Sequence, residues 1–95
     1  MTTEDKQIPI LDALRTPSGH SLVIWCTSCG CHHMHGSGGR PVGEGGGHRV
    51  AHCTRRDGIY ARTGYELREV GMLTKENVVG YFGPQAVRGL RRLMG

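Results

Sequence analysis

The chain has 95 residues, of which 37% are hydrophobic, 5% are aromatic and 16 are glycine. This composition predicts one domain over residues 1–95 and excludes a large apolar core, because small chains bury a limited share of their surface and glycine packs nothing. The net charge of +4 suits contact with nucleic acid or an acidic protein surface. The sequence offers neither the apolar run of about 18 residues that spans a membrane nor a signal-peptide pattern in residues 1–15, so we expect a cytoplasmic protein without membrane contact.

Five stretches have the composition of strands. Residues 8–14 predict a first strand or an arm packed on the sheet, and residues 21–26, which are β-branched and aromatic, predict the clearest strand. Residues 31–35 and 48–53 predict two more, and residues 65–70 alternate apolar and charged side chains as a half-buried strand does. We therefore expect a small antiparallel sheet of the zinc-ribbon kind.

Residues 36–47 contain seven glycines and separate two of these strands. We expect a flexible loop that buries nothing. The loop lacks the P-loop and G-x-G-x-x-G patterns, so a phosphate cradle is not predicted there.

The C-terminal part changes to a helical pattern. Thr74 is a suitable N-cap for a helix over 75–82, Gly83 ends that helix, and Pro84 suits the first turn of a second helix over 84–94. The second helix carries an apolar stripe and three arginines: Arg88, Arg91 and Arg92. The predicted fold class is thus α+β, with a β-rich part over residues 8–70 followed by a helical segment over residues 72–95.

Cysteine and histidine spacing predicts a structural zinc ion. Cys26 and Cys29 are separated by two residues, which lets both thiolates reach one ion from one turn. If residues 31–36 pair antiparallel with residues 48–53, Cys53 returns beside that turn as a third ligand. Zinc would then replace part of the missing apolar core, because metal binding adds to the stability of a small fold.

The residue pattern offers several candidates for the fourth ligand. In the assumed register His33 lies diagonal to Cys53 and is our preferred ligand. Cys31 is the second choice, His35 lies farther along the strand, and a one-residue slip would favour His52 or His32.

Other uses of these residues fit the sequence less well. A redox Cys-x-x-Cys should open a helix in a βαβ unit, and a secreted disulfide framework should spread its cysteines. A catalytic zinc needs an open position and a general base, and no glutamate has suitable spacing from a ligand. We predict no catalytic residues, and a metal-dependent nuclease is only a distant alternative.

The strings Cys26-Thr27-Ser28-Cys29, His33-Met34-His35-Gly36, Gly47-His48-Arg49-Val50-Ala51-His52-Cys53 and Gly64-Tyr65-Glu66-Leu67 resemble a known group. The group consists of small zinc-ribbon-like proteins encoded by actinobacteria and their phages, generally without an assigned function. The resemblance covers roughly residues 23–68, and Cys31 and His32 depart from its pattern. It implies a phage-type zinc protein and leaves the activity open.

Two functions compete on this evidence. The first is binding of nucleic acid, in which the two helices form a helix-turn-helix and Arg88, Arg91 and Arg92 contact phosphates. The second is a regulatory adaptor or inhibitor that docks on a host protein through the apolar face of residues 84–94. Trp25 and the other aromatic residues are expected to be partly core, so no array for stacking bases is predicted.

Overall fold

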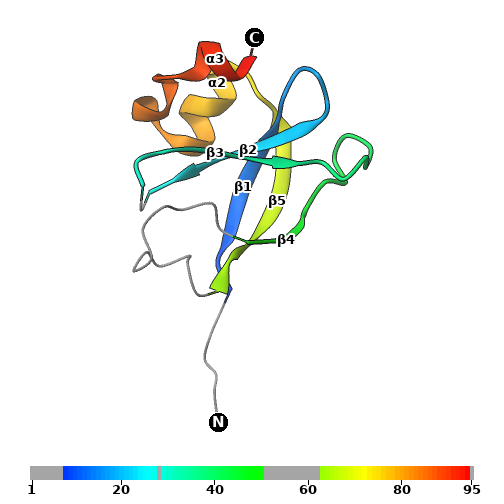
Figure 1. The fold of residues 1–95 in the computed structure, drawn as a ribbon. Helices are drawn as coiled ribbons and strands as arrows, with labels where there is room; N and C mark the ends of the chain where they lie inside the picture. Colours follow the sequence, from blue (N-terminus) through cyan, green and yellow to red (C-terminus); the bar gives the residue numbers. More distant parts are fainter. Residues whose placement is uncertain (1–7, 28, 51–62, 95) are drawn as a thin grey trace.

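A computed structural model describes residues 8–27, 29–50 and 63–94 (Figure 1). A five-stranded sheet is followed by a helical C-terminal segment, so the fold is α+β. The strands are β1 (Ile10–Arg15), β2 (Ser21–Cys26), β3 (Cys31–Gly36), β4 (Gly47–Arg49) and β5 (Tyr65–Met72). Each predicted strand stretch thus contains a strand, although the described part of 48–53 holds only the end of the short β4.

The sheet is mixed rather than antiparallel throughout. Its strand order is β3-β2-β1-β5-β4, in which β1 and β5 pair in parallel and the other neighbours pair antiparallel. The chain leaves β3 at one edge and returns on the far side of β1, which is the long crossover that parallel neighbours require. The antiparallel prediction missed this crossover.

The predicted hairpin between residues 31–36 and 48–53 is wrong for its described residues. Strand β3 pairs instead with β2, with Cys26 opposite Cys31, and β4 pairs with β5. The short turn between β2 and β3 favours this pairing, because closing a short loop costs less entropy than closing the glycine-rich one.

The two edge strands nevertheless approach each other, because the sheet curls. The Nη2 atom of Arg49 in β4 donates a hydrogen bond of 3.2 Å to the carbonyl oxygen of Gly36 at the end of β3. Across the enclosed space, His35 of β3 and Tyr65 of β5 share a hydrogen bond of 2.6 Å. The inner face of the sheet is therefore partly closed on itself.

Alternating side chains build two small cores on opposite faces of the sheet. The inner face holds Ala13, Leu22, Ile24, Cys26, Tyr65 and Leu67. The outer face joins the sheet to the C-terminal segment through Leu14, Val23, Leu73, Val78, Ala86 and Leu90. The helical segment is thus part of the fold, lying against the sheet (Figure 1).

The first predicted helix forms with mixed geometry. It comprises α2 (Lys75–Asn77) and the π-helical η1 (Val78–Phe82), and the hydroxyl of Thr74 caps it by accepting a 3.1 Å hydrogen bond from the amide of Asn77. Gly83, at φ 103°, ends it as predicted. None of the helices among the described residues has the length and apolar character needed to cross a membrane.

The second predicted helix, over 84–94, is wrong as a continuous element. It consists of the 3-10 turn η2 (Pro84–Val87) and the five-residue helix α3 (Leu90–Met94). Arg88 is extended and Gly89 takes φ 85°, a left-handed conformation that interrupts the helix. This break separates Arg88 from the other two arginines.

The glycine-rich loop is held in place, contrary to the expected flexibility. The carboxylate of Glu69 accepts hydrogen bonds from the backbone amides of Gly43 and Gly45, at 2.7 and 2.8 Å. Gly45, within this loop, is itself buried. A loop rich in glycine can therefore be ordered when buried charges satisfy its backbone.

Candidate functional site

Three of the predicted metal ligands meet at one end of the inner core. The ligand atoms of Cys26, Cys29 and His33 all lie within 4.8 Å of one another. Cys26 ends β2, Cys29 lies in the following turn, and His33 is on β3. The backbone amide of Cys29 also donates a hydrogen bond to the sulfur of Cys26 at 3.4 Å.

The register of β2 and β3 explains the position of His33. Cys26 lies opposite Cys31, and His33 lies opposite Ile24, which places His33 diagonal to Cys26 on the inner face. The sequence predicts the same histidine from a different strand pairing, in which His33 lies diagonal to Cys53. His33 is a suitable ligand in both pairings, because each of them places the odd-numbered residues of β3 on one face of the sheet.

The alternative ligands within the described residues have other surroundings. Cys31 is exposed and is not among the mutually close donors. Partial desolvation of its thiol raises the pKa of Cys31, and the neighbouring Cys29 and Cys26 raise it further. His35 is buried and shares its hydrogen bond with Tyr65, deeper in the inner core. Cys53 and His52 lie outside the described residues, so their assignment stays a prediction.

The three donors suit a zinc ion. Thiolate sulfur binds zinc at about 2.3 Å and imidazole nitrogen at about 2.0–2.1 Å, so ligand atoms in a tetrahedral site are under about 4 Å apart. Donors within 4.8 Å of one another reach that geometry with small side-chain shifts. Sulfur and nitrogen donors also disfavour the hard cations magnesium and calcium.

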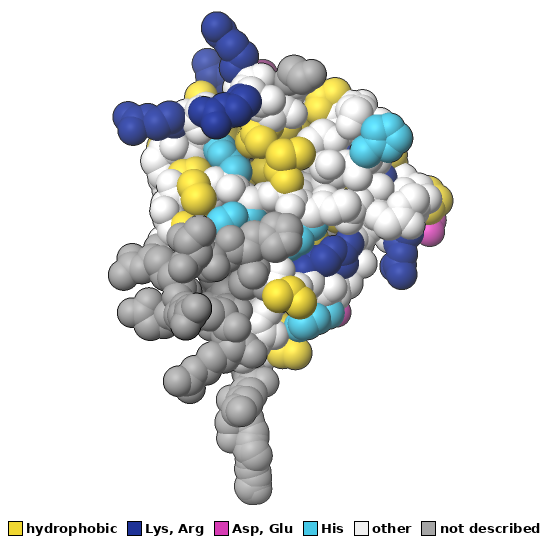
Figure 2. Space-filling model, in the orientation of Figure 1, with side chains coloured by type: hydrophobic (Ala, Val, Ile, Leu, Met, Phe, Trp, Pro, Cys, Tyr) yellow, Lys and Arg dark blue, Asp and Glu magenta, His cyan; other side chains and the backbone are white. Residues whose placement is uncertain are grey.

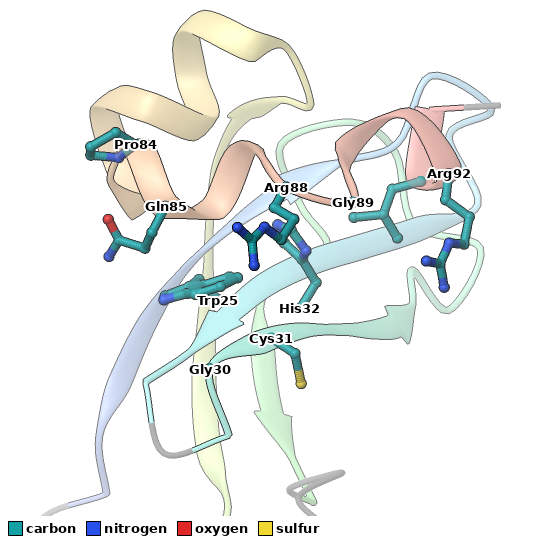
Figure 3. A pocket seen from close by; sticks show the side chains of 10 residues that line it. Trp25, Gly30, Cys31, His32, Pro84, Gln85, Arg88, Gly89 and Arg92 are labelled. Carbon is teal, nitrogen blue, oxygen red and sulfur yellow. The ribbon is translucent and has the colours of Figure 1, made fainter.

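A hollow of about 670 Å³ lies on the opposite face of the same hairpin, between β2–β3 and the C-terminal segment (Figure 3). We call it the basic groove, and the lining residues that matter for its chemistry are Trp25, His32, Gln85, Arg88 and Arg92. Its lining, drawn from the described residues, includes two arginines and no acidic side chain.

Aromatic rings form the floor of the basic groove. The rings of Trp25 and His32 meet edge to face, with centroids 5.0 Å apart and planes at 74°. The ring of Phe82 has its centroid 6.4 Å from that of His32, with the two planes at 59°. Burial lowers the pKa of His32, and a backbone hydrogen bond involving Ala86 partly offsets that effect. The positive charge of the groove comes from its two arginines.

The predicted arginines are divided by the helix break. Arg88, on the extended residue before Gly89, and Arg92, on α3, both line the groove. Arg91 is exposed on α3 but does not contribute to the lining. Figure 2 shows Lys and Arg side chains gathered at the end of the molecule that carries the C-terminal segment.

Trp25 and His32 line the groove although the sequence predicted no site at either residue. Trp25 was expected to be partly core, and its indole does pack against the outer core while it also lines the groove. A signal was present, because each residue directly adjoins a metal candidate in a strand. Neighbours in a strand point to opposite faces, so ligands on the inner face imply a tryptophan and a histidine on the outer face.

Comparison with known proteins adds no assignment. No protein-family model, no curated protein and no solved structure matches this chain. The resemblance to actinobacterial and phage zinc-ribbon-like proteins accordingly stays a prediction from the sequence.

Proposed function

We propose that the chain is a small zinc-stabilised protein that binds nucleic acid through the basic groove. The observation that carries this proposal is the pairing of Arg88 and Arg92 with the aromatic wall of Trp25 in a hollow without acidic lining residues. Guanidinium groups bind phosphate oxygens through paired N–H donors, and aromatic faces accept bases. The zinc has a structural role in this proposal, with Cys26, Cys29, His33 and Cys53 as its ligands.

The proposal differs from the helix-turn-helix predicted from the sequence. A recognition helix must present several side chains along the major groove, whereas α3 spans only Leu90–Met94. Arg88 also lies outside that helix, on extended backbone. The hollow between the hairpin and the C-terminal segment is a better contact surface than the helix alone.

The adaptor alternative loses its original basis. It required the apolar face of residues 84–94 to insert into a host protein, but Leu90 is buried in the outer core and Val87 and Leu93 pack against it. Three of the four apolar side chains of that face therefore pack within the molecule, whereas Met94 is exposed. Docking on a host protein through another surface remains an alternative outcome of the binding test.

Salt dependence tests the proposal directly. We expect short DNA or RNA oligonucleotides to bind at about 50 mM salt and to weaken steeply as salt rises, because counterions are released from the phosphates. The double variant Arg88→Ala and Arg92→Ala should reduce the slope of log K against log salt by about 0.7–0.9 for each lost phosphate contact. Arg40→Ala removes one positive charge, half of what the double variant removes, at an exposed residue outside the groove and should leave the slope nearly unchanged.

Fluorescence anisotropy of a labelled oligonucleotide measures both effects. Absence of binding to any DNA or RNA at low salt would refute nucleic-acid binding, and recovery of a host protein in a pulldown would then favour the adaptor. Equal slopes for the wild type and the groove variant would place the contact elsewhere on the surface.

A further inference from the structure

We infer that the basic groove holds an unstacked base of a single-stranded nucleic acid, with the indole of Trp25 as its stacking platform. The inference rests on the proposed function and specifies the form of the ligand. It follows from the shape of the hollow, the fixed orientation of Trp25 and the placement of the two arginines.

The shape of the hollow favours an isolated base. Its volume of about 670 Å³ lies in the range of small-ligand pockets, which is suitable for a nucleotide. Bases of a duplex are paired and stacked, so one can enter such a hollow only by leaving the stack, at a cost of a few kcal/mol. A single strand offers its bases at little cost.

Trp25 is held in one orientation before any ligand arrives. Its ring packs partly against the outer core and meets His32 edge to face. A fixed aromatic wall loses little conformational entropy on binding, and stacking tolerates any base because every base has a π-face. The site should therefore show little sequence preference.

The arginines lie where a strand would carry its phosphates. Figure 3 shows the side chains of Trp25, His32 and Arg88 converging at one end of the groove, while Arg92 reaches in from α3 at the other. A base on Trp25 thus has a guanidinium beside it and a second one farther along the groove. This arrangement suits the phosphates on either side of one nucleotide.

Trp25 is the only tryptophan of the chain, so its fluorescence reports directly on the groove. Titration with the oligonucleotide dT12 should quench the emission saturably, whereas a blunt 12-base-pair duplex should bind at least about fivefold more weakly and quench little. Thymidine monophosphate alone should bind far more weakly than dT12, because it lacks the neighbouring phosphates.

Variants locate the contact independently of the quenching signal. With labelled dT12, Trp25→Leu should weaken binding by about tenfold and Trp25→Phe by much less, because phenylalanine retains an aromatic face. Melting curves of both variants establish that they are folded, and Trp25→Phe keeps the test open if leucine disturbs the outer core. Arg40→Ala, at an exposed residue outside the groove, should leave the affinity for dT12 nearly unchanged.

The outcomes separate the two proposals. Quenching by dT12 together with the predicted variant order supports the inference. Equal affinity for the duplex without quenching, but with loss of binding in the arginine variants, overturns the single-strand inference and leaves nucleic-acid binding in place. Equal affinity for thymidine monophosphate and dT12 assigns a small-nucleotide site and also overturns it. Absence of binding to all of these probes and to a 12-residue RNA oligonucleotide overturns both proposals.

Discussion

Arg15 and Glu69 form a buried ion pair, with Nη2 and Oε1 2.8 Å apart and both side chains 2% exposed. The Nε atom of Arg15 donates to the other carboxylate oxygen, and its remaining N–H groups reach carbonyl oxygens of Gly19, Arg40 and Pro41. The pair thus joins β1 and β5 to the glycine-rich loop. It stabilises a part of the fold that contains few apolar side chains.

Acid should weaken this junction. The guanidinium of Arg15, followed by the amides of Gly43 and Gly45, lowers the pKa of Glu69 to about 2. Because the folded-state pKa lies below the unfolded value, the stabilisation is fully present above about pH 4.5 and is lost as pH falls towards 2. At neutral pH, Glu69→Gln should cost roughly 3 kcal/mol, since it leaves the buried cation of its partner uncompensated.

The difference between wild type and Glu69→Gln isolates this effect from acid release of the metal. Urea unfolding of both proteins between pH 7 and pH 2 should give free energies that converge below about pH 4.5. Parallel curves over the whole range would contradict the assigned role of Glu69.

Two glycines of the same loop region should respond differently to alanine. A Cβ at Gly46 would lie 2.7 Å from the carbonyl oxygen of Leu67, whereas a Cβ at Gly36 would meet nothing within 4 Å. We expect Gly46→Ala to lose about 1–3 kcal/mol of stability, because backbone must move. Gly36→Ala should stay within about 0.5 kcal/mol of the wild type in chemical denaturation. Similar losses in both variants would show that crowding at Leu67 is not the cause.

Metal content should follow the proposed ligands. Elemental analysis of the purified protein should find about one zinc per chain, and Cys26→Ser or His33→Ala should lower both the zinc content and the melting temperature. His20→Ala is the matched control, because His20 is exposed and outside the ligand group. Cys31→Ser should retain the metal. Loss of zinc from that variant, with retention in His33→Ala, would exchange the roles of the two residues.

Removal of the metal should also weaken nucleic-acid binding. The proposed ligands Cys26 and His33 directly adjoin Trp25 and His32, so one hairpin carries both the candidate metal cluster and the groove. Chelation should shift Trp25 emission to longer wavelength as the indole becomes solvated, and the affinity for dT12 should fall in parallel. Unchanged affinity in metal-free protein would show that the groove forms independently of the metal centre.

Local chemistry in the sequence predicted several elements correctly. The strand at residues 21–26, the cap at Thr74 and the stop at Gly83 all depend on neighbouring residues, and the structure confirms each. The proximity of Cys26, Cys29 and His33 also follows from a short turn and strand alternation. These features need no knowledge of distant parts of the chain.

The wrong predictions concern features that depend on contacts between segments far apart in the sequence. Parallel pairing of β1 with β5 depends on a crossover that no local pattern indicates. The order of the glycine-rich loop depends on Arg15 and Glu69, which are 54 positions apart. The break at Gly89 had a local signal in its low helix propensity, but the packing of Ala86 and Leu90 into one core fixes the bend.

The contact between Arg49 and Gly36 has a consequence for solubility. Strands β3 and β4 are the edge strands of the sheet. Unpaired edge strands allow strands of other molecules to add to the sheet, which leads to aggregation. The curled sheet brings the ends of these two strands together, and the guanidinium of Arg49 donates a hydrogen bond to the carbonyl oxygen of Gly36. That oxygen is then not free to accept a hydrogen bond from the strand of another molecule. Arg49 on β4 thus disfavours strand pairing between molecules. This matters in a chain whose small apolar core contributes little stability.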